Sequence, residues 1–164
     1  MPPLPLQRPI PIWLGGWAEA VLQRVGRLGD GWMPVYVDPR DPAKYEELRG
    51  KVARLRDYTS SAGRPQDAVG IDAQSGVRLL WGGEETWATL ARAWRSLGAT
   101  HLSVDTMGAS LTSLDAHLDA LRKIKEVLDA SAHHPHNTAE ERPRQGAKVH
   151  LPLTPCLFLS ILNY

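Results

Sequence analysis

The stretch Ile12-Trp-Leu-Gly-Gly16, with the segment that follows it to Leu28, decides the fold that this sequence predicts. Residues 12–14 form a short apolar run, and two glycines close it. Apolar side chains then recur at helical spacing, at Val21, Leu22, Val25 and Leu28. The expected order is strand, glycine turn and helix, which is the repeating unit of α/β proteins.

Three further units of this kind follow along the chain. The expected strands are Trp32–Val37, Val69–Ala73 and Thr100–Asp105, and Val77–Trp81 is either a continuation of the second or a separate short strand. The expected helices start at Pro42, after Gly82-Gly83, and at Thr112, where Thr112 and Asp115 resemble a capping box. Alternating strands and helices favour a parallel sheet.

Two architectures satisfy this alternation. One is a small doubly wound sheet that binds a nucleotide, and the other is half of an eightfold β/α barrel. A half-barrel would leave two unpaired sheet edges and a half-exposed core. The pattern alone leaves both open.

Composition narrows the class of partner. The net charge of +1 gives no basic field for nucleic acid or anionic membrane, so neither is expected. The single Cys156 and an N-terminus without a signal-peptide pattern favour a cytoplasmic location. The longest apolar stretch, residues 156–162, is too short to span a bilayer. The expected partners are therefore small molecules.

Three segments resemble the luciferase-like monooxygenase family, most closely its members that use the deazaflavin coenzyme F420. They are Arg8-Pro-Ile-Pro-Ile-Trp-Leu-Gly-Gly16, Leu28-Gly-Asp-Gly-Trp-Met-Pro34 and Leu97-Gly-Ala-Thr-His-Leu-Ser-Val-Asp-Thr-Met-Gly108. Together they cover roughly residues 8–130 in the family's order. The resemblance implies the C-terminal half of a (β/α)8 barrel, with about four β/α units present and the first four strands missing. The chain would then be a fragment of an oxidoreductase.

The resemblance also implies a cofactor, either FMN or coenzyme F420, whose phosphate meets the turn Gly15-Gly16-Trp17-Ala18. An independent physical reason supports this turn as an anion site. Two glycines let the backbone approach an anion closely, and the following helix offers free N–H groups at its positive end. The family often has Ser, Thr or His near these positions, whereas this sequence offers backbone and the indole of Trp17.

A second set of residues is expected to border the cofactor ring or the substrate. It comprises Trp32, Asp105, Thr106, Met107 and Gly108. The last four end a strand, and active sites of β/α barrels lie at that end. A capped turn is the competing interpretation for them. The catalytic side chains stay unknown, because most would come from the absent half.

Other polar residues are given structural roles. Asp30 is expected to serve its turn and His101 to have a structural role at the start of a strand. A hydrolase set of Ser75, His101 and Asp72 lacks the usual nucleophile elbow and is set aside. No metal site is expected, because the histidines at 133, 134 and 136 lack metal-ligand spacing.

The predicted organisation has three parts. Residues 1–11, with five prolines, form a lead-in, residues 12–131 form the half-barrel, and residues 132–164 form an irregular and poorly ordered tail. We expect such a chain to have little activity alone. The alternative is a non-catalytic module that completes a barrel with a partner chain or as a homo-oligomer. Nothing in the sequence identifies the substrate.

Overall fold

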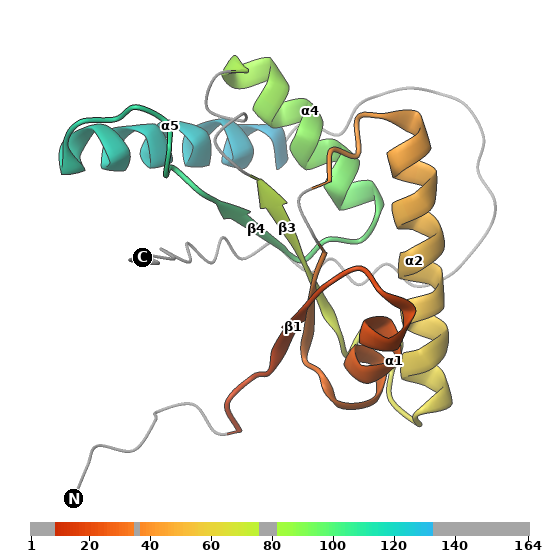
Figure 1. The fold of residues 1–164 in the computed structure, drawn as a ribbon. Helices are drawn as coiled ribbons and strands as arrows, with labels where there is room; N and C mark the ends of the chain where they lie inside the picture. The colour runs from red at the N-terminus through yellow and green to blue at the C-terminus, as the bar shows by residue number, and fades with distance from the viewer. Residues whose placement is uncertain (1–8, 35–36, 76–81, 133–164) are drawn as a thin grey trace, which may run out of the picture.

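The computed structural model describes residues 9–34, 37–75 and 82–132 (Figure 1). Four strands alternate with four helices in these ranges. In chain order the elements are β1 (Trp13–Gly15), α1 (Glu19–Leu28), β2 (Gly31–Met33), α2 (Pro42–Ser61), β3 (Gly70–Ser75), α4 (Gly83–Ser96), β4 (His101–Val104) and α5 (Leu114–Ala132). The predicted α/β alternation is confirmed.

The strands form one parallel sheet in the order β1-β2-β3-β4. Trp13 lies beside Gly31, Gly31 beside Gly70, and Asp72 beside His101. Sequential order without a reversal is the order found in β/α barrels, whereas doubly wound sheets bind nucleotides where the order reverses. The described sheet therefore lacks the crevice that the doubly wound alternative requires.

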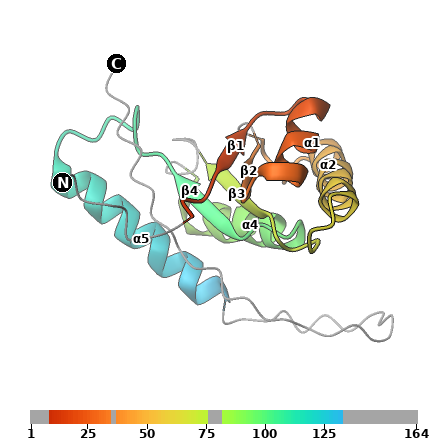
Figure 2. The same cartoon turned by 90° about the horizontal axis from the view of Figure 1, so that it is seen from below.

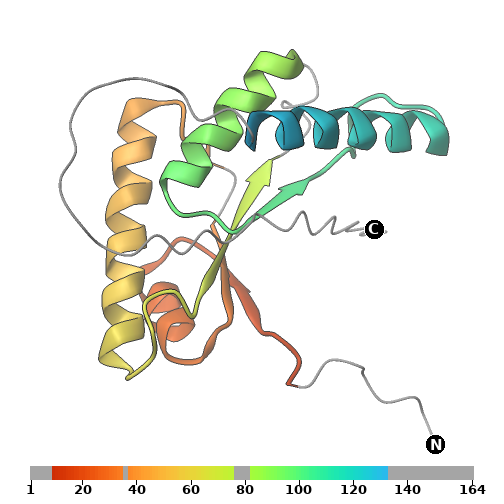
Figure 3. The same cartoon turned by 180° about the vertical axis from the view of Figure 1, so that it is seen from behind.

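The helices lie along one side of a curved sheet, as Figure 2 shows in the view from below. Figure 3, from behind, shows α2 running alongside α1 and α5 crossing α4. The core between sheet and helices includes Trp32, Ile71 and Ala73 from the strands, and Leu22, Leu55 and Trp94 from the helices. Burial of this apolar surface is the main force that holds the helices on the sheet.

Strand residues of the opposite parity face away from this core, because side chains alternate along a strand. Trp13 lies on this second face, and its indole covers Gly31 and Gly70 of the two neighbouring strands. A Cβ atom at Gly31 would stand 2.1 Å from Trp13 Cε3, so only glycine fits beneath the ring. The indole also meets the His101 ring edge-on at a centroid distance of 4.7 Å.

The structure corrects several boundaries. For the strand expected over Trp32–Val37, the structure has β2 at Gly31–Met33, and residues 35–36 lie outside the described residues. The cap of α5 is Ser113 and not Thr112, because Ser113 Oγ accepts a hydrogen bond from Ala116 N at 3.2 Å. Leu28, expected on the buried face of α1, is exposed.

Other expected features are confirmed or fall outside the description. Asp30 serves its turn as predicted, with its carboxylate accepting from Ile12 N at 2.7 Å. The strand considered at Val77–Trp81 and the tail after Ala132 lie outside the described residues. Among the described helices, none has the length and apolar character needed to cross a bilayer.

Candidate functional site

The turn between β1 and α1 is built by Gly15, Gly16, Trp17 and Ala18, and it lies at the carboxyl end of the strand. Gly16 has a φ of +133°, which favours glycine. Its N–H donates to Met33 O at 3.1 Å, so it extends the pairing of β1 with β2. The amide of Gly16 is therefore engaged within the sheet, and any anion would have to use the amides that follow.

Trp32 of β2 supports this turn from the core. Its side chain is fully buried, and its Nε1 donates to Gly16 O at 2.8 Å. The Trp17 indole lies 6.1 Å from the Trp32 ring. The structure thus places Trp32 within the core as a support for the turn.

The N-terminus of α1 has no side-chain cap. Ala18 is the N-cap residue, and a methyl group accepts no hydrogen bond. The first N–H groups of α1 therefore lack the partner that Ser, Thr, Asp or Asn would provide. Glu19 in the first turn is held by Tyr58, whose hydroxyl donates to Glu19 Oε1 at 2.7 Å, and by Arg54 at 3.4 Å. Uncapped amides at the positive end of a helix are a suitable place for an anion.

Helix α2 reaches the turn through two side chains. The Trp17 Nε1 donates to Glu47 Oε1 at 2.9 Å, and Lys51 Nζ donates to Trp17 O at 2.9 Å. The same ammonium lies 4.8 Å from the centre of the Trp17 ring. Hydrogen bonds from Lys44 and then from Trp17 hold the pKa of Glu47 below its ordinary value. Sequence reasoning missed Lys51, because nothing in the sequence distinguishes it from the exposed Arg and Lys residues of the same helix.

Four members of the second predicted set, residues 105–108, follow β4 at the same carboxyl end of the sheet, and they form a tight turn. Met107 N donates to Asp105 Oδ1 at 2.8 Å, and Thr106 Oγ1 is 2.8 Å from His117 Nδ1. Gly108 has a φ of +74°. Met107 is more than half exposed. Asp105 therefore caps its own loop, while Met107 is free to meet a ligand.

A polar cluster on the sheet face opposite the helices was not predicted. Ser103 Oγ lies 2.9 Å from both oxygens of the buried Asp72, and His101 stands beside Asp72 in the sheet. Burial raises the pKa of Asp72, while the Ser103 hydrogen bond and the nearby His101 oppose that rise. His101 Nδ1 lies 2.8 Å from Thr100 Oγ1. No local sequence pattern could predict this cluster, because Asp72 and Ser103 are 31 positions apart.

The structure does not assemble the hydrolase set of Ser75, His101 and Asp72. Ser75 lies in register with Val104, on the opposite face from Asp72. Its Oγ is buried, and it has no hydrogen-bond partner among the residues that the structure describes. No group of three or more metal-ligating side chains gathers within residues 9–34, 37–75 and 82–132.

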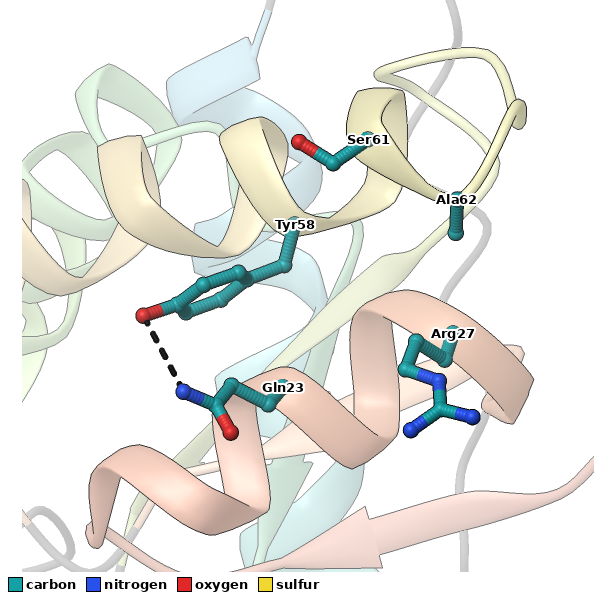
Figure 4. Close-up of a pocket in the computed structure, with 5 residues that line it drawn as sticks. All are labelled: Gln23, Arg27, Tyr58, Ser61 and Ala62. Atoms are coloured by element: carbon teal, nitrogen blue, oxygen red, sulfur yellow. Dashed lines mark hydrogen bonds between the residues drawn. The ribbon is translucent and has the colours of Figure 1, made fainter.

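A shallow groove lies between α1 and α2 (Figure 4). Its volume is about 270 Å³, and its lining residues are Gln23, Arg27, Tyr58, Ser61 and Ala62. Gln23 Nε2 donates to Tyr58 Oη at 3.5 Å across it. The groove is a shallow seam between two packed helices.

Comparison with known families gives one match. The model of a family described as luciferase-like monooxygenase matches residues 1–150. The matched range extends past the end of α5 at Ala132. A search of curated proteins finds no significant match.

Proposed function

The chain belongs to the luciferase-like monooxygenase family, and from this premise we propose that its β1–α1 turn holds the phosphate of a flavin or deazaflavin cofactor. The family is of the oxidoreductase type. When bound, FMN or coenzyme F420 would supply the redox chemistry, while this chain would bind and orient it. The observation that carries the proposal is the uncapped N-terminus of α1 behind a glycine turn.

The residues of the turn fit a phosphate group. A Cβ atom added at Gly15 would have only ordinary contacts, the nearest being Met33 O at 3.7 Å, so the backbone is open to close approach. Ala18 and the first amides of α1 present N–H groups without a side-chain competitor. The two carboxylates nearest to the turn, Glu19 and Glu47, each already have a cationic partner. An anion would therefore meet backbone donors and little repulsion.

The turn after β4 is proposed to border the cofactor ring or the substrate. It lies at the same carboxyl end of the sheet as the glycine turn, because the strands are parallel. Thr106, Met107 and Gly108 are its candidates for contact, with Asp105 shaping the loop. Trp32 contributes through its support of Gly16.

We propose that the four described β/α units form half of an eightfold barrel, which their parallel sheet with sequential strand order supports. In this proposal the other half comes from another polypeptide segment or another copy, and it brings most of the catalytic groups. We therefore expect weak cofactor binding and little turnover from these units alone.

Equilibrium dialysis of the full chain against FMN and against riboflavin tests the proposal, because riboflavin lacks the phosphate. We expect FMN to bind more tightly, and we expect Gly16→Ala to reduce that preference, since alanine is strained at a φ of +133°. Gly50→Ala is the matched control, because no atom lies within 4 Å of its added methyl group. Equal affinity of the wild type for FMN and riboflavin would exclude a phosphate site.

A second candidate function is a non-catalytic module that completes a barrel with a second copy. The observation in its favour concerns the sheet edges. Among the described large apolar side chains that are exposed, four flank the edge strands in sequence, namely Ile10 and Ile12 before β1 and Met107 and Leu114 after β4. Unpaired strand edges with apolar neighbours favour association.

Size-exclusion chromatography with light scattering separates this candidate from the first. Self-completion predicts a dimer that Ile12→Lys dissociates, while Leu28→Lys, at an exposed position on α1, leaves it intact. A monomer that unfolds cooperatively at all protein concentrations would rule out this second candidate.

A further inference from the structure

Asp72 is buried on the sheet face opposite the helices, and its carboxylate has few hydrogen-bond donors. Only 6% of the residue is exposed, and Ser103 Oγ lies 2.9 Å from both carboxylate oxygens. A carboxylate can accept about four hydrogen bonds. Among the residues that the structure describes, Ser103 is its hydrogen-bond donor, and no lysine or arginine acts on it. Because a buried carboxylate is costly unless it is paired, Asp72 calls for a further donor.

His101 of β4 lies in register with Asp72 on the same sheet face. Its ring meets Trp13 edge-on at a centroid distance of 4.7 Å, and its Nδ1 lies 2.8 Å from Thr100 Oγ1. In the described part of the chain, its Nε2 has no hydrogen-bond partner. Of the described strand residues on this face, only His101 can carry a positive charge. The face therefore presents a carboxylate that needs a donor and, beside it, an imidazole nitrogen that can donate.

A sheet face with both of these groups is complementary to itself. A twofold dimer uses the same surface on both subunits, so each group must meet its complement on the partner. In a barrel that two copies complete, the face opposite the helices is the interior, so the two faces are turned toward each other. Strands β1 and β4 are the edges of the described sheet, where the second copy would continue the sequential strand order.

We infer that this face is a dimer interface in which Asp72 of each copy pairs with His101 of the second copy. The inference rests on the second candidate function, completion of a barrel by a second copy, and it names the polar contacts that select the partner. Each twofold dimer then contains two such pairs. They supply the donor that Asp72 lacks within the described chain.

An interaction within one chain is the competing explanation. The two groups are close enough for His101 to oppose the rise in the pKa of Asp72 that burial causes. A mixture of the variants Asp72→Asn and His101→Gln separates the explanations. In the mixed dimer one chain supplies Asp72 and the other supplies His101, so one intermolecular pair is restored. Neither chain of that dimer has both groups, so no pair within a chain is restored.

The experiment measures association of the full chain in two ways. Light scattering over a dilution series gives the dimer dissociation constant, and we expect each variant alone to raise it about tenfold through loss of a buried polar pair. Native mass spectrometry of an equimolar mixture, with one variant isotope-labelled, gives the share of mixed dimers. We expect this share to exceed the value for random pairing. Asp119→Asn is the control for loss of a carboxylate, because Asp119 is exposed on α5 and should leave the wild-type dissociation constant unchanged.

The outcomes distinguish the inference from the candidate function on which it rests. If the wild type dimerises but the mixed dimers form only at the random share, the inference is wrong and completion by a second copy survives. If the wild type is monomeric at every concentration, that candidate fails and the inference fails with it. Should His101→Gln not fold, His101→Phe takes its place, because it keeps a ring against Trp13 but has no donor.

Discussion

At the scale of single residues, the candidate site depends on side chains that brace a backbone turn. Trp32 and Lys51 both bond to carbonyl groups of the turn, at Gly16 and Trp17. Both act from neighbouring elements, Trp32 from β2 and Lys51 from α2. Side chains from β2 and α2 therefore support the conformation of the turn.

The hydrogen bond of Trp32 can be isolated with a second buried tryptophan. Trp94 is 2% exposed, and its Nε1 has no hydrogen-bond partner in the described part of the chain, whereas Trp32 Nε1 donates to Gly16 O. Trp32→Phe and Trp94→Phe remove similar apolar volume, but only the first removes a hydrogen bond. We expect Trp32→Phe to cost about 1 kcal/mol more in the free energy of unfolding. Urea denaturation of both variants measures this difference. Equal losses in the free energy of unfolding would argue against a stabilising role of the Trp32 hydrogen bond.

The burial of Asp72 predicts a pH-dependent stability. Burial raises its pKa, so the folded state binds the proton more tightly than the unfolded chain. Stability therefore falls as pH rises from the ordinary carboxyl range, near 4, through the raised pKa of the folded state. Asp72→Asn does not titrate and can still accept the Ser103 hydrogen bond. We expect the variant to gain melting temperature over the wild type as pH rises through this window, and a gap independent of pH would refute this explanation.

Sequence reasoning reached the turn but not its surroundings. Gly15 and Gly16 can be recognised from the sequence alone, because a pair of glycines indicates a turn of the backbone. Lys51 is 34 positions from Trp17, and its contact with the turn can be recognised only when the packing of α2 beside the turn is known. The cluster of Asp72 and Ser103 is likewise created by strand pairing, which no local pattern in the sequence specifies.

At the scale of elements, α1 and α2 come into close contact at Gly26. A Cβ atom there would lie 2.7 Å from Tyr58 Cβ and 2.9 Å from Thr59 N, so the helices would have to separate. We expect Gly26→Ala to lower the free energy of unfolding by about 1–3 kcal/mol through overpacking.

Gly50→Ala is the control within α2. No atom lies within 4 Å of its added methyl group, so the variant should gain about 0.5–1 kcal/mol from higher helix propensity. Chemical denaturation followed by circular dichroism compares the two variants. Finding Gly26→Ala as stable as Gly50→Ala would show that the two helices are not held in close contact at this point.

Element types were predictable where the apolar period was clear. The helix expected after Gly82-Gly83 is α4, and its apolar side chains Trp87, Leu90, Ala91 and Trp94 recur at helical spacing and are buried. Boundaries were harder, because β2 contains only three residues and Ser113, rather than its neighbour Thr112, caps α5. Local hydrogen bonds decide such ends, and neighbouring Ser and Thr residues compete for them.

At the scale of the whole molecule, strand order was the missing information. Alternating strands and helices favoured a parallel sheet but left the barrel and doubly wound topologies open. The sequential order β1-β2-β3-β4 removes the reversal that a doubly wound nucleotide site requires. Helices on one side and a partly polar opposite face agree with a portion of a barrel (Figure 2). The family match agrees with the resemblance of the three segments.

The central claim is that backbone amides of the β1–α1 turn bind the phosphate of the cofactor. The most direct test is a titration of the isotope-labelled chain with FMN, followed through the NMR shifts of its backbone amides. We predict that the largest shifts fall on Trp17, Ala18, Glu19 and Ala20 and that riboflavin does not reproduce them. Shifts concentrated instead around Gln23, Arg27 and Tyr58, in the groove between α1 and α2, would contradict the account.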